Sequence, residues 1–384
     1  MKLAWFRPTR PERPPLLDDL AGVISQVRQR HSVEVIDAAS AHDFVWRHAR
    51  GAFDLAVYEL DGTRDHAFIW AYLLNYPGVV TFRAPSIHAS RAEALLHRRR
   101  AADYAAELAF SEGQRRAVAP WHVGHGSWPM LRVPLRASRM TIVPDLAWAL
   151  ALERDHPGAV VRAVPIGVPA PASSGPPGER PATPDAPLVV ACLDDAPAHH
   201  LERAVARVRE AGSPVTLLTT GDPATRLRQA DVVAALGRPA VSGPMTAALL
   251  GLAAGKAVLV AETEPTAAWP ALDPQNWQPR VNRRRAPVVV SIDPRDEEHS
   301  LVLALRRLAG DAPFRRALGE AGHAWWQAHG SSAVAAASWL ACLEDALALP
   351  QPARPDGWPA HLDDDGTGRA RAFLAECGVT TDLF

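Results

Sequence analysis

Residues 231–262 constrain the fold of this chain more than any other part of the sequence. An apolar run at 232–236 is followed by a loop of glycines and prolines, and then by an Ala/Leu-rich stretch that predicts a helix over 246–254. Gly255 is a residue type that commonly ends helices, and the unbroken apolar run at 257–261 is typical of a buried parallel strand. Strand, loop, helix and strand in this order form a βαβ unit, which predicts a parallel sheet.

The loop of this unit precedes the first turn of a helix. Backbone N–H groups in that turn have no partner within the helix, and the helix dipole adds partial positive charge. Such a position can bind a phosphate or another anion. Many loops of this kind bind nothing, so the sequence leaves open whether the loop before 246–254 is an anion site or an ordinary connection.

The same alternation of strands and helices runs through both halves of the chain, which predicts an α/β fold with parallel sheets covered by helices on both faces. Further strands are expected at 2–6, 33–36, 55–58, 140–143, 161–165, 188–192, 215–219 and 288–292. Further helices are expected at 16–30, 41–50, 91–110, 145–155, 199–211, 297–309, 311–330 and 332–347.

These patterns divide the chain into domains. A first α/β domain is expected at 1–169 and a second at 188–349, and a chain of 384 residues is long enough to give each a full core. Residues 170–187 are rich in Pro, Ser and Gly and have no apolar period, which is typical of a linker. The tail at 350–384 either packs against the first domain or binds a partner.

The composition excludes several classes of function. Lys+Arg 41 against Asp+Glu 42 gives a net charge of −1, so no overall charge attracts nucleic acid or a membrane surface. No apolar run suits a signal peptide or an integral membrane segment, and three cysteines are too few for a disulfide framework, so we expect a cytoplasmic protein. The excess of arginine over lysine and the abundance of alanine indicate a GC-rich bacterial gene.

One pair of histidines has a spacing that is seen in metal sites. His122 and His125 lie in an irregular segment with two tryptophans, but no cysteine or carboxylate nearby completes a ligand set. A loop packed by its tryptophans is therefore the favoured interpretation. We expect neither a metal nor another cofactor.

Several segments resemble retaining glycosyltransferases of the GT-B fold, of the family 4-like kind. The segments that carry the resemblance are AAGKAV at 253–258, YELDG at 58–62, HAFI at 66–69, YPGVV at 76–80, PIGV at 165–168 and HGS at 329–331. The resemblance implies two Rossmann-like domains that face each other across a cleft, with a C-terminal helix that crosses back onto the first domain. It also implies transfer of a sugar from a nucleotide-sugar donor to a sugar, lipid or protein acceptor.

The resemblance also places candidate site residues. His66 and His88 would be catalytic, through hydrogen bonds to sugar hydroxyls or phosphate oxygens. Equally, each of these histidines could cap a helix or fill a half-buried interface. Tyr58 and Arg83 would lie on the acceptor side. The residues expected to bind the donor are His199, His200, Arg203, Gly221, Ser242, Gly243, Pro244, Met245 and Thr246.

The chain departs from the family pattern in its donor segment. Neither glutamate of the family pair is present at the corresponding positions, near 242 and near 250. The lysine that binds the diphosphate is missing from the start of helix 199–211, and Asp194 and Asp195 before it would repel a diphosphate. His199, His200 or Arg203 could take over the role of that lysine.

The N-terminal domain departs from the pattern as well. The turn at 7–15 contains no glycine, so Arg7 and Arg10 either replace a close backbone contact with charge or belong to an ordinary surface loop. Two functions therefore stay open: a glycosyltransferase, or a catalytically impaired relative that acts as a binding or scaffolding protein, with a protein partner bound through the tail. An epimerase on the same fold is a third option, which no feature selects.

Overall fold

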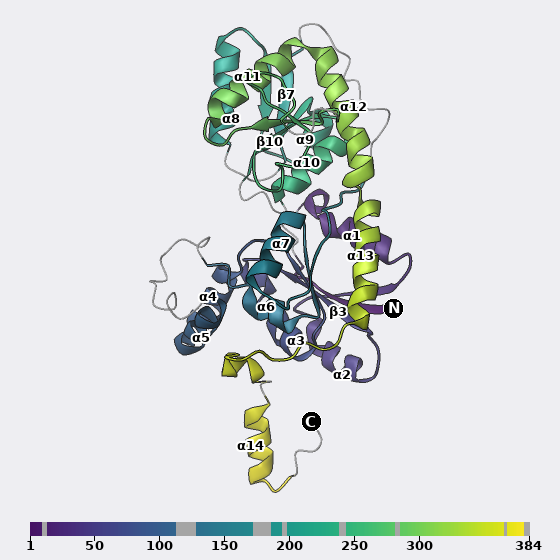
Figure 1. Ribbon diagram of the computed structural model, residues 1–384, viewed down its shortest axis with the longest axis vertical. Coiled ribbons are helices and arrows are strands. Elements are labelled where there is room, and N and C mark those ends of the chain that lie inside the picture. The colour runs from purple at the N-terminus through teal and green to yellow at the C-terminus, as the bar shows by residue number, and fades with distance from the viewer. Residues whose placement is uncertain are drawn as a thin grey trace.

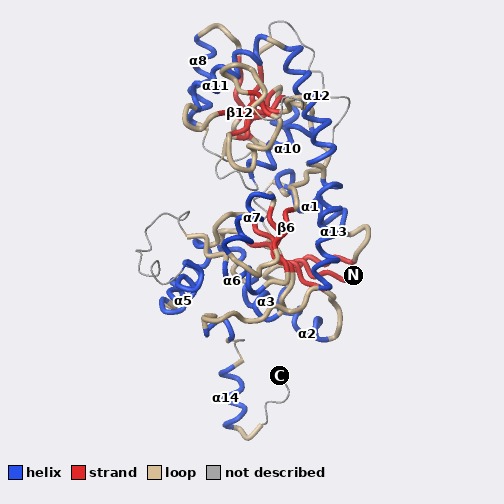
Figure 2. Tube along the Cα trace, viewed as in Figure 1, coloured by secondary structure: helices blue, strands red, loops and turns tan. Residues whose placement is uncertain are grey.

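The computed structural model describes residues 1–9, 14–112, 128–171, 186–193, 198–237, 243–280, 285–364 and 367–379. They form two α/β units that follow one another along the long axis of the molecule (Figure 1). Each unit is built on a six-stranded parallel sheet, and the strands of the two sheets form two separate groups (Figure 2). The predicted fold class, two Rossmann-like domains, is confirmed.

The N-terminal sheet has the strand order β2-β1-β3-β4-β5-β6. Its strands are β1 (Lys2–Phe6), β2 (Ser32–Ile36), β3 (Leu55–Leu60), β4 (Val79–Phe82), β5 (Met140–Val143) and β6 (Val161–Ala163). Its helices are η1 (Pro15–Leu17), α1 (Asp19–Val27), η2 (Ala41–Asp43), α2 (Phe44–Ala49), η3 (Arg64–His66), α3 (Ile69–Asn75), α4 (His88–Leu96), α5 (Ala101–Glu112), α6 (Arg132–Ala137) and α7 (Leu146–Asp155).

Alternate residues of each strand enter different cores, because successive side chains of a strand point to opposite faces of the sheet. On β1, Ala4 and Phe6 pack in one core with residues of α2 and α3, whereas Leu3 and Trp5 pack in the other with residues of α1. Both faces are therefore covered. This double coverage explains why the strands of this unit read as nearly continuous apolar runs.

One sequence expectation for this unit is wrong. The single helix predicted over 91–110 is two helices, α4 and α5, which pack against each other. The chain reverses between them, and Arg99 takes a left-handed backbone conformation with φ 59°. The reversal brings Arg91 of α4 to Glu107 of α5, where the guanidinium donates two hydrogen bonds to the buried carboxylate.

The C-terminal sheet has the strand order β11-β12-β10-β9-β7-β8. Its strands are β7 (Leu188–Cys192), β8 (Val215–Leu218), β9 (Val232–Ala235), β10 (Ala257–Ala261), β11 (Ala271–Leu272) and β12 (Val289–Ile292). Its helices are α8 (His199–Glu210), α9 (Pro223–Gln229), α10 (Gly243–Ala253), α11 (Glu297–Gly310) and α12 (Ala312–His329). The βαβ unit expected at 231–262 is confirmed as β9, α10 and β10. Gly255 lies in the turn between α10 and β10 with φ 65°, a conformation that favours glycine.

Helix α13 (Ser332–Ala348) crosses back from the C-terminal unit to the N-terminal one, as expected (Figure 1). It packs along α1, and the ring of Trp339 lies with its centroid 5.0 Å from that of Trp5. The two helices approach closely at Gly22, where an added Cβ would lie 2.5 Å from Oγ of Ser332. The crossing helix thus fixes the N-terminal unit to the end of the chain.

The first part of the tail packs against the N-terminal unit. Leu362 is buried in its core, and the ring of Trp358 meets the ring of Phe110 edge to face at 5.5 Å. His361 is hydrogen-bonded to Glu107 of α5 over 2.8 Å. Helix α14 (Gly368–Glu376) extends beyond the body of the molecule (Figure 1). Packing, one of the two uses left open for the tail, is confirmed for this part, and a partner stays a prediction.

Two properties bear on the classes of function considered above. None of the helices formed by the described residues is both long enough and apolar enough to cross a bilayer. No group of three or more His, Cys, Asp or Glu side chains among those same residues is arranged to hold a metal ion. His122 and His125, Asp194 and Asp195, and most of the predicted linker lie outside the described ranges.

Candidate functional site

The carboxyl edges of the two sheets meet at the junction between the units. Helix η1 lies beyond the carboxyl end of β1, and α10 begins beyond the carboxyl end of β9. These two helices are in contact, and Leu17 of η1 packs within a core cluster of the C-terminal unit that includes Leu249 of α10. In open α/β sheets, ligands bind beyond the carboxyl ends of the strands, so this junction is the first place to look for a site.

A network of arginines and carboxylates lies along the edge of the N-terminal sheet. Arg7, directly after β1, donates two hydrogen bonds to Asp18, of 2.8 and 2.9 Å, and its Nε lies 3.2 Å from Oε2 of Glu59 on β3. Arg83, directly after β4, donates a hydrogen bond to Asp19, and its Nε lies 3.9 Å from Oε1 of Glu59. We call these five residues the edge network.

Both arginines of the edge network stay charged, although Arg83 is buried and Arg7 is half-buried. Burial acts to lower the pKa of Arg7, but Glu59 and Asp18 more than offset it, so the pKa is raised. Burial likewise acts to lower the pKa of Arg83, but Asp19 and Glu59 raise it above its usual value. Ion pairing therefore outweighs desolvation at both guanidiniums.

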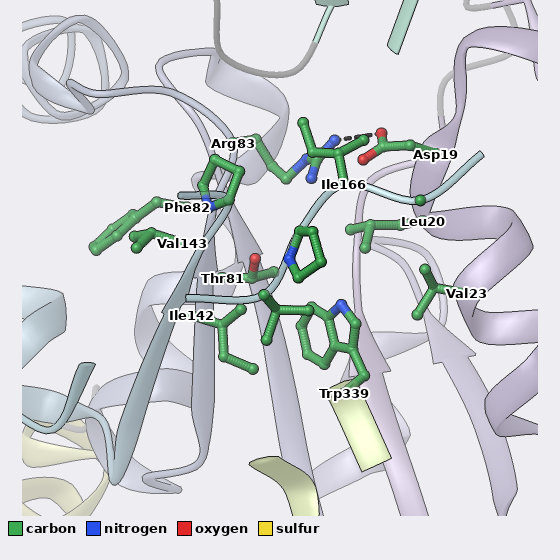
Figure 3. Close-up of a pocket in the computed structure, with 14 residues that line it drawn as sticks. Asp19, Leu20, Val23, Thr81, Phe82, Arg83, Ile142, Val143, Ile166 and Trp339 are labelled. Atoms are coloured by element: carbon green, nitrogen blue, oxygen red, sulfur yellow. Dashed lines mark hydrogen bonds and ion pairs between the residues drawn. The ribbon is translucent and has the colours of Figure 1, made fainter. Parts of the chain in front are cut away.

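The space beside Arg83 is nearly filled. A cavity of about 10 Å³ lies between the network and α13, with Arg83 and Asp19 at its rim and Leu20, Ile166 and Trp339 around it (Figure 3). A volume of this size holds about one water molecule. This cavity beside Arg83, the residue placed on the acceptor side by the sequence, is therefore too small for a sugar.

A larger cavity opens on the Arg7 side of the same network. It has a volume of about 270 Å³ and is lined by Arg7, Pro8, Thr9, Pro15, Asp18, Val35 and Glu59. We call it the Arg7 cavity. Its lining combines a guanidinium, two carboxylates and a hydroxyl, which are groups that can bind the hydroxyls of a sugar.

Thr9, which lines the Arg7 cavity, lowers the pKa of the neighbouring Asp37. The Thr9 hydroxyl donates a hydrogen bond of 2.7 Å to Asp37, and this bond, followed by bonds from Ser40, lowers the pKa of Asp37 from 3.8 to about 2. Thr9→Ala should therefore raise the pKa of Asp37 toward 3.8, which an NMR pH titration of the full chain measures. Thr225→Ala removes a comparable threonine–aspartate bond, to Asp222, and should leave Asp37 unchanged.

The sign of the stability effect follows from the same shift. A depressed carboxyl pKa stabilises the fold above the pKa of the unfolded chain, here about pH 4, and this contribution is lost as the pH falls through about 2. Thr9→Ala should reduce the contribution. A pKa of Asp37 that does not move in Thr9→Ala would contradict the assignment.

On the C-terminal unit, the predicted donor residues of the βαβ loop lie in the first turn of α10. Gly243 and Pro244 begin the helix, Thr246 is fully buried, and Met245 is partly buried against the core cluster that contains Leu17. Ser242 lies outside the described residues. The N-terminus of α10 therefore points to the junction, as the βαβ unit requires.

A third cavity, which we call the β10–β12 cavity, lies at the carboxyl ends of β10 and β12. It has a volume of about 400 Å³ and is lined by Glu262, Thr263, Glu264, Ala267, Asp293, Pro294 and Arg295. Nη1 of Arg280 lies 2.6 Å from Oε2 of Glu262, and Arg295 donates a hydrogen bond of 3.1 Å to Asp293. The hydrogen bonds from Arg295 lower the pKa of Asp293 below its usual value. Because β9 and β10 are adjacent, this cavity lies beside the start of α10.

The predicted donor residues on α8 are at the surface. His199 and His200 are exposed. Arg203 donates a 2.6 Å hydrogen bond to Glu298 of α11, and its Nη2 lies 2.9 Å from Nδ1 of His200. Its charge is thus already paired. Gly221, with φ 93°, forms the turn before α9, a backbone reason for glycine that needs no ligand.

The two predicted catalytic histidines and Tyr58 are inside the N-terminal unit. Nδ1 of His66 lies 2.7 Å from Oδ1 of Asp61, and Nε2 of His88 lies 2.7 Å from the Tyr104 hydroxyl. The Tyr58 hydroxyl donates a 2.6 Å hydrogen bond to the Tyr76 carbonyl, and burial raises the pKa of Tyr58 well above its usual value. None of the three is among the described residues that line the cavities above. A catalytic role stays a prediction; both rings are fully buried, whereas the alternative named from the sequence was a helix cap or a half-buried interface.

Two residues at these edges escaped the sequence-based search. Glu59 is a charged residue inside a strand whose six residues are all buried, LAVYEL, and that contrast is a usable sequence signal. Arg226 of α9 is only 5% exposed and donates hydrogen bonds to the carbonyls of Cys192, Leu193 and Thr219 at the ends of β7 and β8. Nothing in the local sequence distinguishes it from a surface arginine.

Comparison with known proteins identifies the architecture. No protein-family model and no curated sequence matches the chain. Among solved structures, a sucrose-phosphate synthase from Thermosynechococcus elongatus is 12% identical with a TM-score of 0.56, over 90% of this chain and 98% of that one. HepE from Anabaena, in complex with UDP and glucose, is 13% identical with a TM-score of 0.57, over 90% and 100%. WaaG, a glycosyltransferase involved in lipopolysaccharide biosynthesis, is 14% identical with a TM-score of 0.50, over 88% and 98%. The fold of this chain is the GT-B fold.

Proposed function

We propose that this protein transfers a sugar from a nucleotide-sugar donor to an acceptor at the junction between its two units. The observation that carries the proposal is the meeting of two carboxyl edges, each with its own polar cavity. Similar solved structures include HepE in complex with UDP and glucose, which supports a nucleotide-sugar as the donor. The retaining stereochemistry and the range of acceptors, a sugar, a lipid or a protein, rest on the sequence resemblance alone.

The donor would bind to the C-terminal unit. The first turn of α10 offers backbone N–H groups and the positive end of the helix dipole to the diphosphate. The neighbouring β10–β12 cavity offers carboxylates to the neutral hydroxyls of the donor. As the bond from the sugar to the diphosphate breaks, the N–H groups of α10 would stabilise the charge that develops on the leaving group.

The acceptor would bind to the N-terminal unit, in the Arg7 cavity. Tyr58, His66, His88 and Arg83, which the resemblance placed on this side, would then act on the site only through other residues. Positioning of donor and acceptor, with electrostatic stabilisation of the leaving group, would supply most of the rate enhancement. The proposed reaction needs no metal.

A second function has a specific observation in its favour. Leu16 and Leu17 pack against the core cluster that includes the start of α10, and Arg203 is already paired with Glu298. Apolar contacts where a diphosphate would approach fit a glycosyltransferase-like protein that binds a partner without transferring a sugar. Binding of a nucleotide separates the two functions, because only the enzyme requires it.

A charge variant in the first turn of α10 tests the donor site. Met245→Glu should weaken binding of the preferred donor, chosen from UDP-, GDP- and ADP-glucose, by about 10- to 100-fold relative to Met245→Gln. The two variants have the same shape and lose the same apolar contact, so their difference reports repulsion of the diphosphate. Isothermal titration calorimetry measures it. Equal affinities of the two variants would place the diphosphate elsewhere, and a lack of response to all three donors would favour the binding protein.

A further inference from the structure

We propose that Glu59 is the acceptor-binding residue and that the Arg7 cavity takes a group rich in hydrogen-bond donors, the hydroxyl or amino groups of a sugar-like acceptor, and disfavours anions. That the ligand is the acceptor of a sugar rests on the proposed function. The binding chemistry rests on the cavity itself and can be tested without any donor.

One carboxylate oxygen of Glu59 lacks a hydrogen bond among the described residues. Its side chain lines the Arg7 cavity and is 4% exposed, yet Oε2 accepts no hydrogen bond from any described residue. Its neighbours are guanidinium Nε atoms, at 3.2 Å on Arg7 and 3.9 Å on Arg83. A buried carboxylate oxygen that accepts no hydrogen bond is costly, and such atoms are rare in native proteins unless they serve a function.

The edge network has more carboxylates than guanidiniums. Arg7 has its own carboxylate in Asp18, and Arg83 has its own in Asp19. Glu59 is therefore the surplus charge, and the network carries one more carboxylate than guanidinium. Without Glu59, two balanced ion pairs would remain. Within the edge network, Glu59 therefore shares the two guanidiniums with Asp18 and Asp19, and the five residues keep a net negative charge.

These two features define the ligand. A hydroxyl or ammonium group would donate the hydrogen bond that Glu59 lacks, and the surplus negative charge favours a cation and repels an anion. The Thr9 hydroxyl and the Asp18 carboxylate supply further polar contacts in the same wall. A volume of about 270 Å³ is below the range of drug-sized pockets, so it suits one small polar ring or a polyol of similar size.

The first test measures thermal unfolding of the full chain. Glu59→Gln removes the surplus charge and should leave the melting temperature unchanged or raise it. Asp19→Asn leaves the buried Arg83 without its main carboxylate and should lower the melting temperature by several degrees. A loss in Glu59→Gln as large as that in Asp19→Asn would make Glu59 a structural charge and overturn the proposal.

The second test measures ligand binding by saturation-transfer NMR. The probes are D-glucosamine, methyl α-D-glucopyranoside and D-glucuronate, which are cationic, neutral and anionic, at equal millimolar concentrations. The unaltered protein should give a signal for D-glucosamine at least threefold that for D-glucuronate, with the neutral probe between them. Glu59→Gln should abolish this order, whereas Glu93→Gln, which changes an exposed glutamate of the same unit, should keep it.

The outcomes separate this inference from the proposed function. An unchanged order in Glu59→Gln, or the absence of a signal from all three probes, contradicts the inference. In either case UDP-, GDP- or ADP-glucose can still bind at α10, and the proposed function then stands. Conversely, probe binding that depends on Glu59, together with no response to any nucleotide-sugar, supports Glu59 as the ligand-binding residue of the Arg7 cavity and contradicts the proposed glycosyltransferase activity.

Discussion

Glu107→Leu is expected to lower the free energy of unfolding by about 3–5 kcal/mol, because it leaves the buried guanidinium of Arg91 without a counter-ion. Glu107 is fully buried and accepts hydrogen bonds from Arg91 and from His361 of the tail. Burial acts to raise the pKa of Glu107, but the bonds from His361 and Arg91 prevail and lower it. Urea unfolding of the full chain measures the loss.

Two further variants show whether the unpaired charge causes this loss. Arg91→Met combined with Glu107→Leu removes both charges and should recover most of the stability, since an apolar pair of similar volume can replace a buried ion pair. Glu93→Leu breaks an exposed pair between Glu93 of α4, the helix that carries Arg91, and Arg64 of η3, and it should cost no more than about 1 kcal/mol. A loss below about 1 kcal/mol in Glu107→Leu itself would contradict the buried ion pair.

Gly319→Ala is expected to destabilise the C-terminal unit by about 3 kcal/mol or more, although alanine normally favours a helix over glycine. Gly319 lies within α12, and an added Cβ would lie 2.1 Å from the carbonyl oxygen of Gly255, the residue that ends the βαβ helix. The neighbouring atom is backbone, so the strand β10 or the helix would have to move. Thermal or urea unfolding measures the effect.

The matched control is another helical glycine. Gly310 is the last residue of α11, and an added Cβ there has no heavy atom within 4 Å. Gly310→Ala should therefore be neutral or stabilise the protein by up to about 1 kcal/mol. A loss of stability in Gly319→Ala, together with an unchanged or higher stability in Gly310→Ala, would support the close packing of α12 on the βαβ unit. A Gly319→Ala variant with unchanged stability would contradict it.

Much of the fold could be predicted because its signals are local. The apolar runs of β1, β7 and β10 and the turn at Gly255 are each patterns of only a few consecutive residues, and the strand–helix alternation follows from such patterns. The break between α4 and α5 was missed because its benefit is non-local. The pairing of Arg91 with Glu107 exists only after the chain has reversed.

The site was harder to predict, for a related reason. Resemblance of short segments placed His66 and Tyr58, but the structure decides which way each side chain points, and both find partners in the interior. A charged residue inside an apolar strand was the available signal for Glu59. The sequence gives no comparable signal for Arg226, because a buried arginine on a helix has the same local pattern as an exposed one.

The central claim is that a nucleotide-sugar binds where α10 meets the junction of the two units. Hydrogen–deuterium exchange of the full chain, with and without saturating UDP-, GDP- or ADP-glucose, tests it most directly. One of the three donors should slow exchange of the amides in the first turn of α10 and at the carboxyl ends of β9 and β10. Exchange that is unchanged with every donor, or that slows only in the N-terminal unit, would contradict the claim.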